Sequence, residues 1–208
     1  MKPVILATLL PVIFITTIFG CSHSDKIANN TTTPVATDYS QKNTLDSFSL
    51  NQKADEAILV DGKNQTLATI TSEKSGKFKI LDSAGKNIGY VVAKKDSWKL
   101  KNSEQNQELY TLKKQDDGDY KLKDAVNQEI YRIKVRDDNF EIETPDKKSF
   151  YQVITKAGKT SLMNTANKTS FSPKSDLSPI AVACFGFDVL TREQQAGLAF
   201  AVNSTGGK

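Results

Sequence analysis

The sequence predicts a mainly β protein: a closed antiparallel barrel of about 12 strands, formed by successive hairpins around a buried hydrophobic C-terminal helix. Three observations lead to this prediction. Runs of alternating polar and apolar residues recur about every 20 residues, which is the period-two pattern of strands with one buried face. Turn-forming residues separate the runs. An apolar stretch near the C-terminus is hydrophobic on nearly every side, as an enclosed helix would be.

The regular part of the chain is a repeated pair of runs. The first members are FKILD, WKLKN, YKLKD and FEIET, which begin at residues 78, 98, 120 and 140. Each is followed by a second member, IGYVV, LYTLK, IYRIK or FYQVI. Turn sequences such as SAGKN and SEQNQE lie inside the pairs, so each pair is predicted to form one β-hairpin.

Two less regular hairpins extend the series. Residues 57–71 contain Asp61-Gly62 at a turn, and residues 159–171 follow the last regular pair. A single sheet of about 12 strands in sequential order would leave two exposed edges. Closing the sheet into a barrel removes these edges, and a barrel is therefore predicted.

The apolar stretch 178–203, SPIAVACFGFDVLTREQQAGLAFAVN, is predicted to fill the barrel as a helix over residues 179–202. Ser178 suits a helix N-cap and Pro179 the first helical turn. The first apolar segment, residues 180–190, would form a helix of about 16 Å, which is well short of a bilayer core of roughly 30 Å. The charged TREQQ then interrupts the apolar run, and Thr191 with Gln194 could form a capping box that starts a second segment.

The N-terminus is predicted to be a lipoprotein signal peptide over residues 1–20. A lysine at position 2 precedes an apolar run that ends at Phe19, and this run is short for a bilayer span. The run closes with IFGC, which resembles the lipobox of bacterial lipoproteins. The resemblance implies that Cys21 receives a diacylglycerol and becomes the mature N-terminus. The alternatives are an ordinary cleaved signal, or a single-span anchor, with a chance cysteine.

Residues 21–50 are predicted to be a flexible tether, because Asn, Thr, Ser and Asp dominate them and large apolar residues are sparse. A tether of roughly 25 residues has a root-mean-square span of about 25–30 Å. The barrel domain is then expected over residues 51–208. In lipoproteins the residue after the cysteine influences sorting, and Ser22 implies the outer membrane of the cell envelope if the host is Gram-negative.

The hairpins FKILD…IGYVV and the segment PIAVACFGFDVL, within residues 56–203, resemble the tubby C-terminal-like fold. This group includes the tubby domain, the LURP-one-related proteins and the phospholipid scramblases. The resemblance implies a barrel that binds lipid head groups in some members or acts as a membrane-associated module in others. The chain lacks the cysteine-rich palmitoylation segment of the scramblases, and no binding residue of the family can be placed on it.

The residues do not predict an enzyme. The single histidine, His23, falls in the tether, where no fold would hold it for catalysis. Cys184 lies in the apolar helix and is predicted to be a small core residue. The Asp-rich DDGD at 116–119 is interpreted as a turn, because strand residues follow too soon for a calcium loop. No metal or other cofactor is predicted, and the net charge of +4 does not favour nucleic acid as a partner.

One group of surface lysines is a candidate membrane-facing patch: Lys94, Lys95, Lys99 and Lys101. Trp98 lies among them, and tryptophan favours membrane interfaces. The alternative is that the alternation in WKLK turns Trp98 inward and leaves the lysines in water.

A second candidate is Asp188, which is expected at a polar position of the buried helix. A buried carboxylate needs a hydrogen bond or a charged partner. It could make a functional contact at the mouth of the barrel. Alternatively it caps the segment that starts at Thr191, or pairs with Arg192 four residues on.

These observations predict a membrane-anchored lipoprotein with a non-enzymatic module that binds lipid or lies close to it. Its expected partners are membrane lipid, through acylated Cys21, and lipid head groups. The alternative is a structural or assembly lipoprotein that docks a protein of the envelope. Salt distinguishes the two, since screening weakens binding of head groups by lysines.

Overall fold

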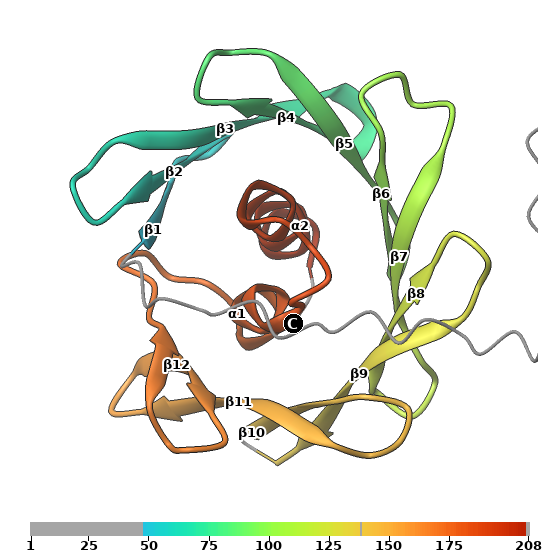
Figure 1. The fold of residues 1–208 in the computed structure, drawn as a ribbon, viewed down its shortest axis with the longest axis vertical. Helices are drawn as coiled ribbons and strands as arrows, with labels where there is room; N and C mark the ends of the chain where they lie inside the picture. Colours follow the sequence, from blue (N-terminus) through green and yellow to red (C-terminus); the bar gives the residue numbers. More distant parts are fainter. Residues whose placement is uncertain (1–47, 138, 207–208) are drawn as a thin grey trace, which may run out of the picture. The chain divides into compact units, whose positions relative to one another are not determined.

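A computed structural model describes residues 48–137 and 139–206. Thirteen strands form one antiparallel sheet in sequential order, which curls into a nearly closed barrel (Figure 1). The strands are β1 (Phe48–Gln52), β2 (Glu56–Asp61), β3 (Thr66–Glu73), β4 (Lys77–Asp82), β5 (Asn87–Lys94), β6 (Ser97–Lys101), β7 (Glu108–Lys114), β8 (Tyr120–Asp124), β9 (Glu129–Arg136), β10 (Asn139–Glu143), β11 (Ser149–Lys156), β12 (Lys159–Asn164) and β13 (Thr169–Phe171). The predicted fold class is confirmed.

Each repeated sequence pair forms a hairpin, as predicted. FKILD and IGYVV lie in β4 and β5, and the later pairs form β6–β7, β8–β9 and β10–β11. The prediction omitted β1, whose first residue, Phe48, pairs with Asp61. The expected start of the domain at residue 51 therefore falls inside a strand. Its sequence, FSLNQ, lies outside the repeated pairs and the two added hairpins on which the prediction was based.

The six turns inside the hairpins share one backbone design. In the β2–β3 turn, Asn64 donates its N–H to the carbonyl of Asp61, and Asp61 donates its own to Gln65. The residue at the Asn64 position has positive φ in all six turns: 61° at Asn64 and 78° at Gly85 in the first two. This is a tight turn followed by a left-handed residue. Its recurrence explains the repeat of about 20 residues.

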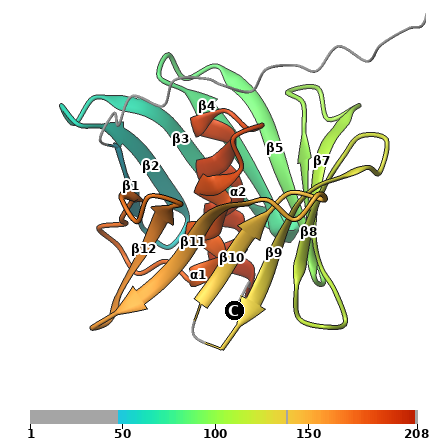
Figure 2. The same ribbon diagram turned by 60° about the horizontal axis from the view of Figure 1, so that its bottom comes forward.

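The two ends of the barrel differ in what they carry. Successive strands run in opposite directions, so these six turns all lie at one end, together with Phe48. We call this the entry end, because the described chain enters the barrel there. The links between hairpins lie at the other end, the far end. The last helix also finishes at the far end, beside the β5–β6 turn (Figure 2).

The barrel encloses two helices, α1 (Pro179–Ala183) and α2 (Arg192–Thr205), and two short 3-10 turns accompany the fold, η1 (Lys74–Gly76) and η2 (Cys184–Gly186). Ser178 caps α1, with Pro179 in its first turn. Thr191 and Gln194 form the expected capping box of α2. Within the predicted helix 179–202 the helical backbone is interrupted at Phe187, which has φ −89° and ψ 84°. Helix α2 is the second segment that the capping box indicated.

The barrel is closed by side chains at the seam between β1 and β13. No backbone pairing joins these two strands within the described chain. The rings of Phe48 and Phe171 stack across the seam with centroids 4.9 Å apart, and Phe185 packs on both. Ser175, just after β13, donates a hydrogen bond to the carbonyl of Leu50 in β1. The edge strands are therefore covered, as edges in soluble sheets usually are.

Candidate functional site

The interior of the barrel is filled by its own helices. A Cβ atom placed on Gly197 of α2 would lie 2.4 Å from Cδ1 of Ile80 in β4. One placed on Gly186 would lie 2.6 Å from Cδ1 of Ile142 in β10. Both distances are below van der Waals contact, so the helices rest directly on the sheet at these points. Aromatic and aliphatic side chains from both layers form a continuous buried core. No ligand can lie between the helices and the sheet at these two points.

The candidate lysines divide into two groups. Lys94 and Lys95 are exposed in and beside the β5–β6 turn at the far end. Lys99 and Lys101 lie on the outer face of β6, because Trp98 and Leu100 between them are buried. The alternative interpretation of WKLK is therefore the one that the structure matches: Trp98 points inward and the lysines of β6 point outward. Trp98 belongs to the core and is not available for insertion into a membrane.

Lys99 is paired with a carboxylate of the neighbouring strand on the outer face of the sheet. Its ammonium group lies 2.7 Å from Glu108 Oε2 in β7. Thr111 donates a further hydrogen bond to this carboxylate. Partial burial acts to raise the pKa of the Glu108 carboxyl, but the hydrogen bonds from Lys99 and Thr111 hold that pKa below its ordinary value. Glu108 therefore stays ionised at neutral pH, and Lys99 contributes little free positive charge to the surface.

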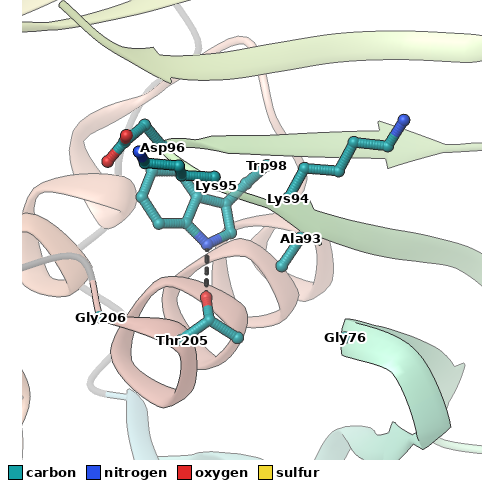
Figure 3. Close-up of a pocket in the computed structure, with 8 residues that line it drawn as sticks. All are labelled: Gly76, Ala93, Lys94, Lys95, Asp96, Trp98, Thr205 and Gly206. Atoms are coloured by element: carbon teal, nitrogen blue, oxygen red, sulfur yellow. Dashed lines mark hydrogen bonds between the residues drawn. The ribbon is translucent and has the colours of Figure 1, made fainter.

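A pocket of about 330 Å³ lies beside Lys94 and Lys95 (Figure 3). The indole N–H of Trp98 donates a 2.8 Å hydrogen bond to the hydroxyl of Thr205, near the end of α2. Figure 3 shows Lys94 extending away from the indole, while Lys95 reaches toward the side where Asp96 lies. The pocket is thus formed where the β5–β6 turn meets the last turn of the central helix.

The charges around this pocket are mixed. The C-terminus of a helix carries partial negative charge, which favours a cation and disfavours an anion. Asp96 adds a carboxylate, while Lys94 and Lys95 supply two ammonium groups. The lysines partly offset the helix end and Asp96, so the pocket has no strong preference for a phosphate group. The geometry does not single it out as a head-group site.

Asp188 does not occupy a buried helical position, and that expectation is wrong. It is exposed and follows η2, in the non-helical link before α2. The hydroxyl of Tyr151 in β11 donates to its carboxylate, at 3.3 Å from each oxygen. The capping box of α2 uses Gln194 instead, and Arg192 donates to Gln195 and lies over the ring of Phe48. The break in the helix turned Asp188 outward.

The other candidate chemical groups have structural roles. Cys184 is fully buried, and its thiol donates to the carbonyl of Ile180. Burial raises the pKa of this thiol far above its ordinary value, so it is not a nucleophile. Asp119, in DDGD, accepts from the N–H of Val135 and lies 3.6 Å from Arg132. Within the described residues, no three His, Cys, Asp or Glu side chains gather as metal ligands would.

Sequence reasoning overlooked two residues at the entry end. Val126, in the β8–β9 turn, is 78% exposed, and Phe150, at the start of β11, is 37% exposed. They are the exposed large hydrophobic side chains of the described chain. A signal for Val126 was present in the sequence, because AVNQE places an apolar residue in a turn where polar residues are usual. Cys21, the predicted lipidation site, lies outside the described residues.

Comparisons with known proteins give a distant likeness in fold. No protein-family model matches the chain. No curated protein matches it either. Among solved structures it is similar to a protein from Arabidopsis thaliana, with 16% sequence identity and a TM-score of 0.40. The likeness covers 51% of this chain and 70% of that protein.

The described helices do not meet the requirements of a membrane span. None of them, within residues 48–137 and 139–206, is both long and apolar enough to cross a bilayer.

Proposed function

We propose that the chain is a membrane-anchored lipoprotein whose barrel is a non-enzymatic module that binds lipid or works close to lipid. We further propose that the barrel is of the tubby-like kind, in which hairpin-connected strands surround a hydrophobic C-terminal helix. The anchor would be Cys21, and residues 22–47 would connect it to β1. In a Gram-negative host the outer membrane would be the destination.

One observation supports this function best: the barrel has no room for a substrate where its helices rest on the sheet. Gly186 and Gly197 bring α1, η2 and α2 so close to the strands that an added methyl group would clash. The thiol of Cys184 is buried and held neutral, so it does not supply a nucleophile. A module of this kind acts through its outer surface and its position.

The proposed attachment to the membrane through Cys21 is tested by comparing the wild-type chain with Cys21→Ser in the natural host. Acyl chains contribute about 0.8 kcal/mol per buried methylene, and two chains hold a protein on a membrane. The wild-type protein is expected in the membrane fraction, and Cys21→Ser in the soluble or uncleaved precursor fraction. Equal membrane association of both proteins after removal of residues 1–20 would contradict lipid anchoring.

Binding by the barrel itself is tested by native mass spectrometry of the wild-type chain, purified in detergent from host membranes. A lipid that co-purifies beyond the covalent acyl chains would support lipid binding. Removal of that lipid by Lys94→Glu and Lys95→Glu would assign it to the far end. A single protein partner that survives high salt, with no bound lipid, would favour docking of an envelope protein instead.

A further inference from the structure

We propose that the entry end of the barrel faces the bilayer, with Val126 and Phe150 in contact with the membrane interface. This inference rests on the proposed lipid anchor and states which face of the module meets the membrane. It differs from the interpretation of Lys94 and Lys95 as the membrane patch, because those lysines lie at the far end.

The two exposed apolar side chains lie on neighbouring hairpins. Val126 is in the β8–β9 turn, and Phe150 immediately follows the β10–β11 turn. Strand β9 pairs with β10, so these two hairpins are adjacent in the wall of the barrel. Isolated exposed apolar residues are common on soluble proteins and need no explanation. Here both occur at one end, and it is the end where the chain from Cys21 enters at Phe48.

The fold holds the backbone turn that carries Val126 and the ring of Phe150. The N–H of Val126 donates to the Asp124 carboxylate, which fixes the turn that presents the valine. The ring of Phe150 packs edge-on against Tyr131, with centroids 6.3 Å apart, and Tyr131 stacks on the buried Phe187. The exposed edge of Phe150 thus continues an aromatic series from the core. Ordered side chains lose little conformational entropy when they meet a surface.

The length of the connecting chain favours the bilayer as the partner. The tether predicted from the sequence between Cys21 and β1, of about 26 residues, would have a root-mean-square span of roughly 25–30 Å, which would keep the entry end within reach of the membrane. A tether of this size gives a local concentration on the order of millimolar. A contact through two apolar side chains is too weak to hold a free domain on a membrane, but it can orient a tethered one.

Charge is predicted to play a minor part in this contact. Lys147 and Lys148 are exposed beside Phe150 and could meet lipid phosphates. However, Asp146 accompanies them, and Asp61, Asp82 and Asp124 begin three of the other turns at this end. The orientation should therefore change little with salt, unlike binding through a lysine patch.

The test uses the full lipidated chain in vesicles of phosphatidylethanolamine and phosphatidylglycerol that contain a nitroxide-labelled lipid. A fluorophore is attached to Val126→Cys or, as the matched control at the far end, to Lys95→Cys. Native cysteines do not interfere, because Cys184 is buried and Cys21 carries the lipid. We expect several-fold stronger quenching by the nitroxide at position 126 than at position 95, at low and at high salt. Adding Phe150→Ser should reduce the quenching at position 126, with an unchanged melting temperature as the control for folding.

Other outcomes separate the two proposals. If the lipidated protein floats with the vesicles but both positions are quenched equally, or position 95 more, the orientation is wrong and the anchor stands. If it does not float with them at all, both proposals fail. If position 126 is shielded from aqueous iodide without lipid and the protein sediments as a dimer, the entry end meets a second copy instead, and the orientation is again overturned.

Discussion

At the scale of single residues, the molecule depends on positions where nothing larger fits. Gly197 and Gly186 let the central helices rest on the strands, and Cys184 fills a gap near them as a small apolar group. Gly89 of β5 allows a similarly close approach to β6, because an added Cβ would lie 2.8 Å from the carbonyl oxygen of Lys101. Interiors are packed like crystals, so such positions tolerate little change.

Gly197→Val should lower the free energy of unfolding by about 2–3 kcal/mol, because the new side chain overlaps Ile80 in a closed core. Denaturant unfolding measures the loss. Adding Ile80→Ala should restore part of the stability by making room, and the pair would then show a favourable coupling energy. Ser204→Val, at an exposed position of the same helix, is the control and should have little effect. Equal losses for Gly197→Val and Ser204→Val would contradict the close packing.

Cys184 should make stability depend on pH in the alkaline range. The buried thiol remains protonated in the folded protein, whereas in the unfolded chain it ionises near a pKa of about 8.5. Above that pH the unfolded state is favoured, so the free energy of unfolding falls by up to about 1.4 kcal/mol per pH unit. Below it the thiol has no effect on the pH dependence. The loss between pH 8 and 10 should be smaller in Cys184→Ala than in the wild type, and equal slopes would show that the thiol ionises in both states.

At the scale of elements, the unit of construction is a hairpin with a fixed turn. An aspartate or asparagine begins most of the six turns and accepts hydrogen bonds from the backbone ahead; Asp61 accepts from Lys63 and Gln65, and Asp82 from Ala84 and Lys86. A left-handed residue then completes each turn. These turns fix the register, because each is accompanied by a register shift in the hairpin that it closes, such as the one between Leu59 and Val60.

The left-handed position predicts opposite effects in two equivalent turns. Gly85 has φ 78° and Gln105 has φ 61°, at the same point of neighbouring entry-end turns. Gly85→Ala should lower the melting temperature, since the left-handed conformation costs a non-glycine residue about 1 kcal/mol or more. Gln105→Gly should raise the melting temperature, because it removes the same conformational cost. The expected gain in the free energy of unfolding is about 0.5–1 kcal/mol. Thermal unfolding of both variants is the measurement. A loss of stability in both would contradict a shared turn geometry.

The sequence predicted the elements well where the signal is local. Alternation gave twelve of the thirteen strands and the inward direction of Trp98, and the capping box at Thr191 is present. The second helical segment was predicted from its cap at Thr191, but the apolar run before it gave no local signal that the backbone turns at Phe187. The exposure of Asp188, which directly follows Phe187, was for that reason not predicted either. The exposure of Val126 and Phe150 at one end likewise required the topology of the whole sheet.

At the scale of the whole molecule, the barrel is a plugged cylinder with two different ends. The described chain enters at one end and α2 finishes at the other (Figures 1 and 2). Val126 and Phe150 are exposed at the entry end, and Lys94 and Lys95 lie beside the end of α2. The seam is closed by stacked aromatic rings, so neither sheet edge is open for pairing. Such a body suits a role that depends on where it is held and which face it presents.

The central claim is that Cys21 carries the lipid that holds this barrel at a membrane. The most direct test is the intact mass of the mature chain, purified from membranes of its natural host, with fragmentation of its N-terminal peptide. We expect a chain that begins at Cys21 and carries a thioether-linked diacylglycerol. An unmodified Cys21, in a chain that begins at any other residue, would contradict it.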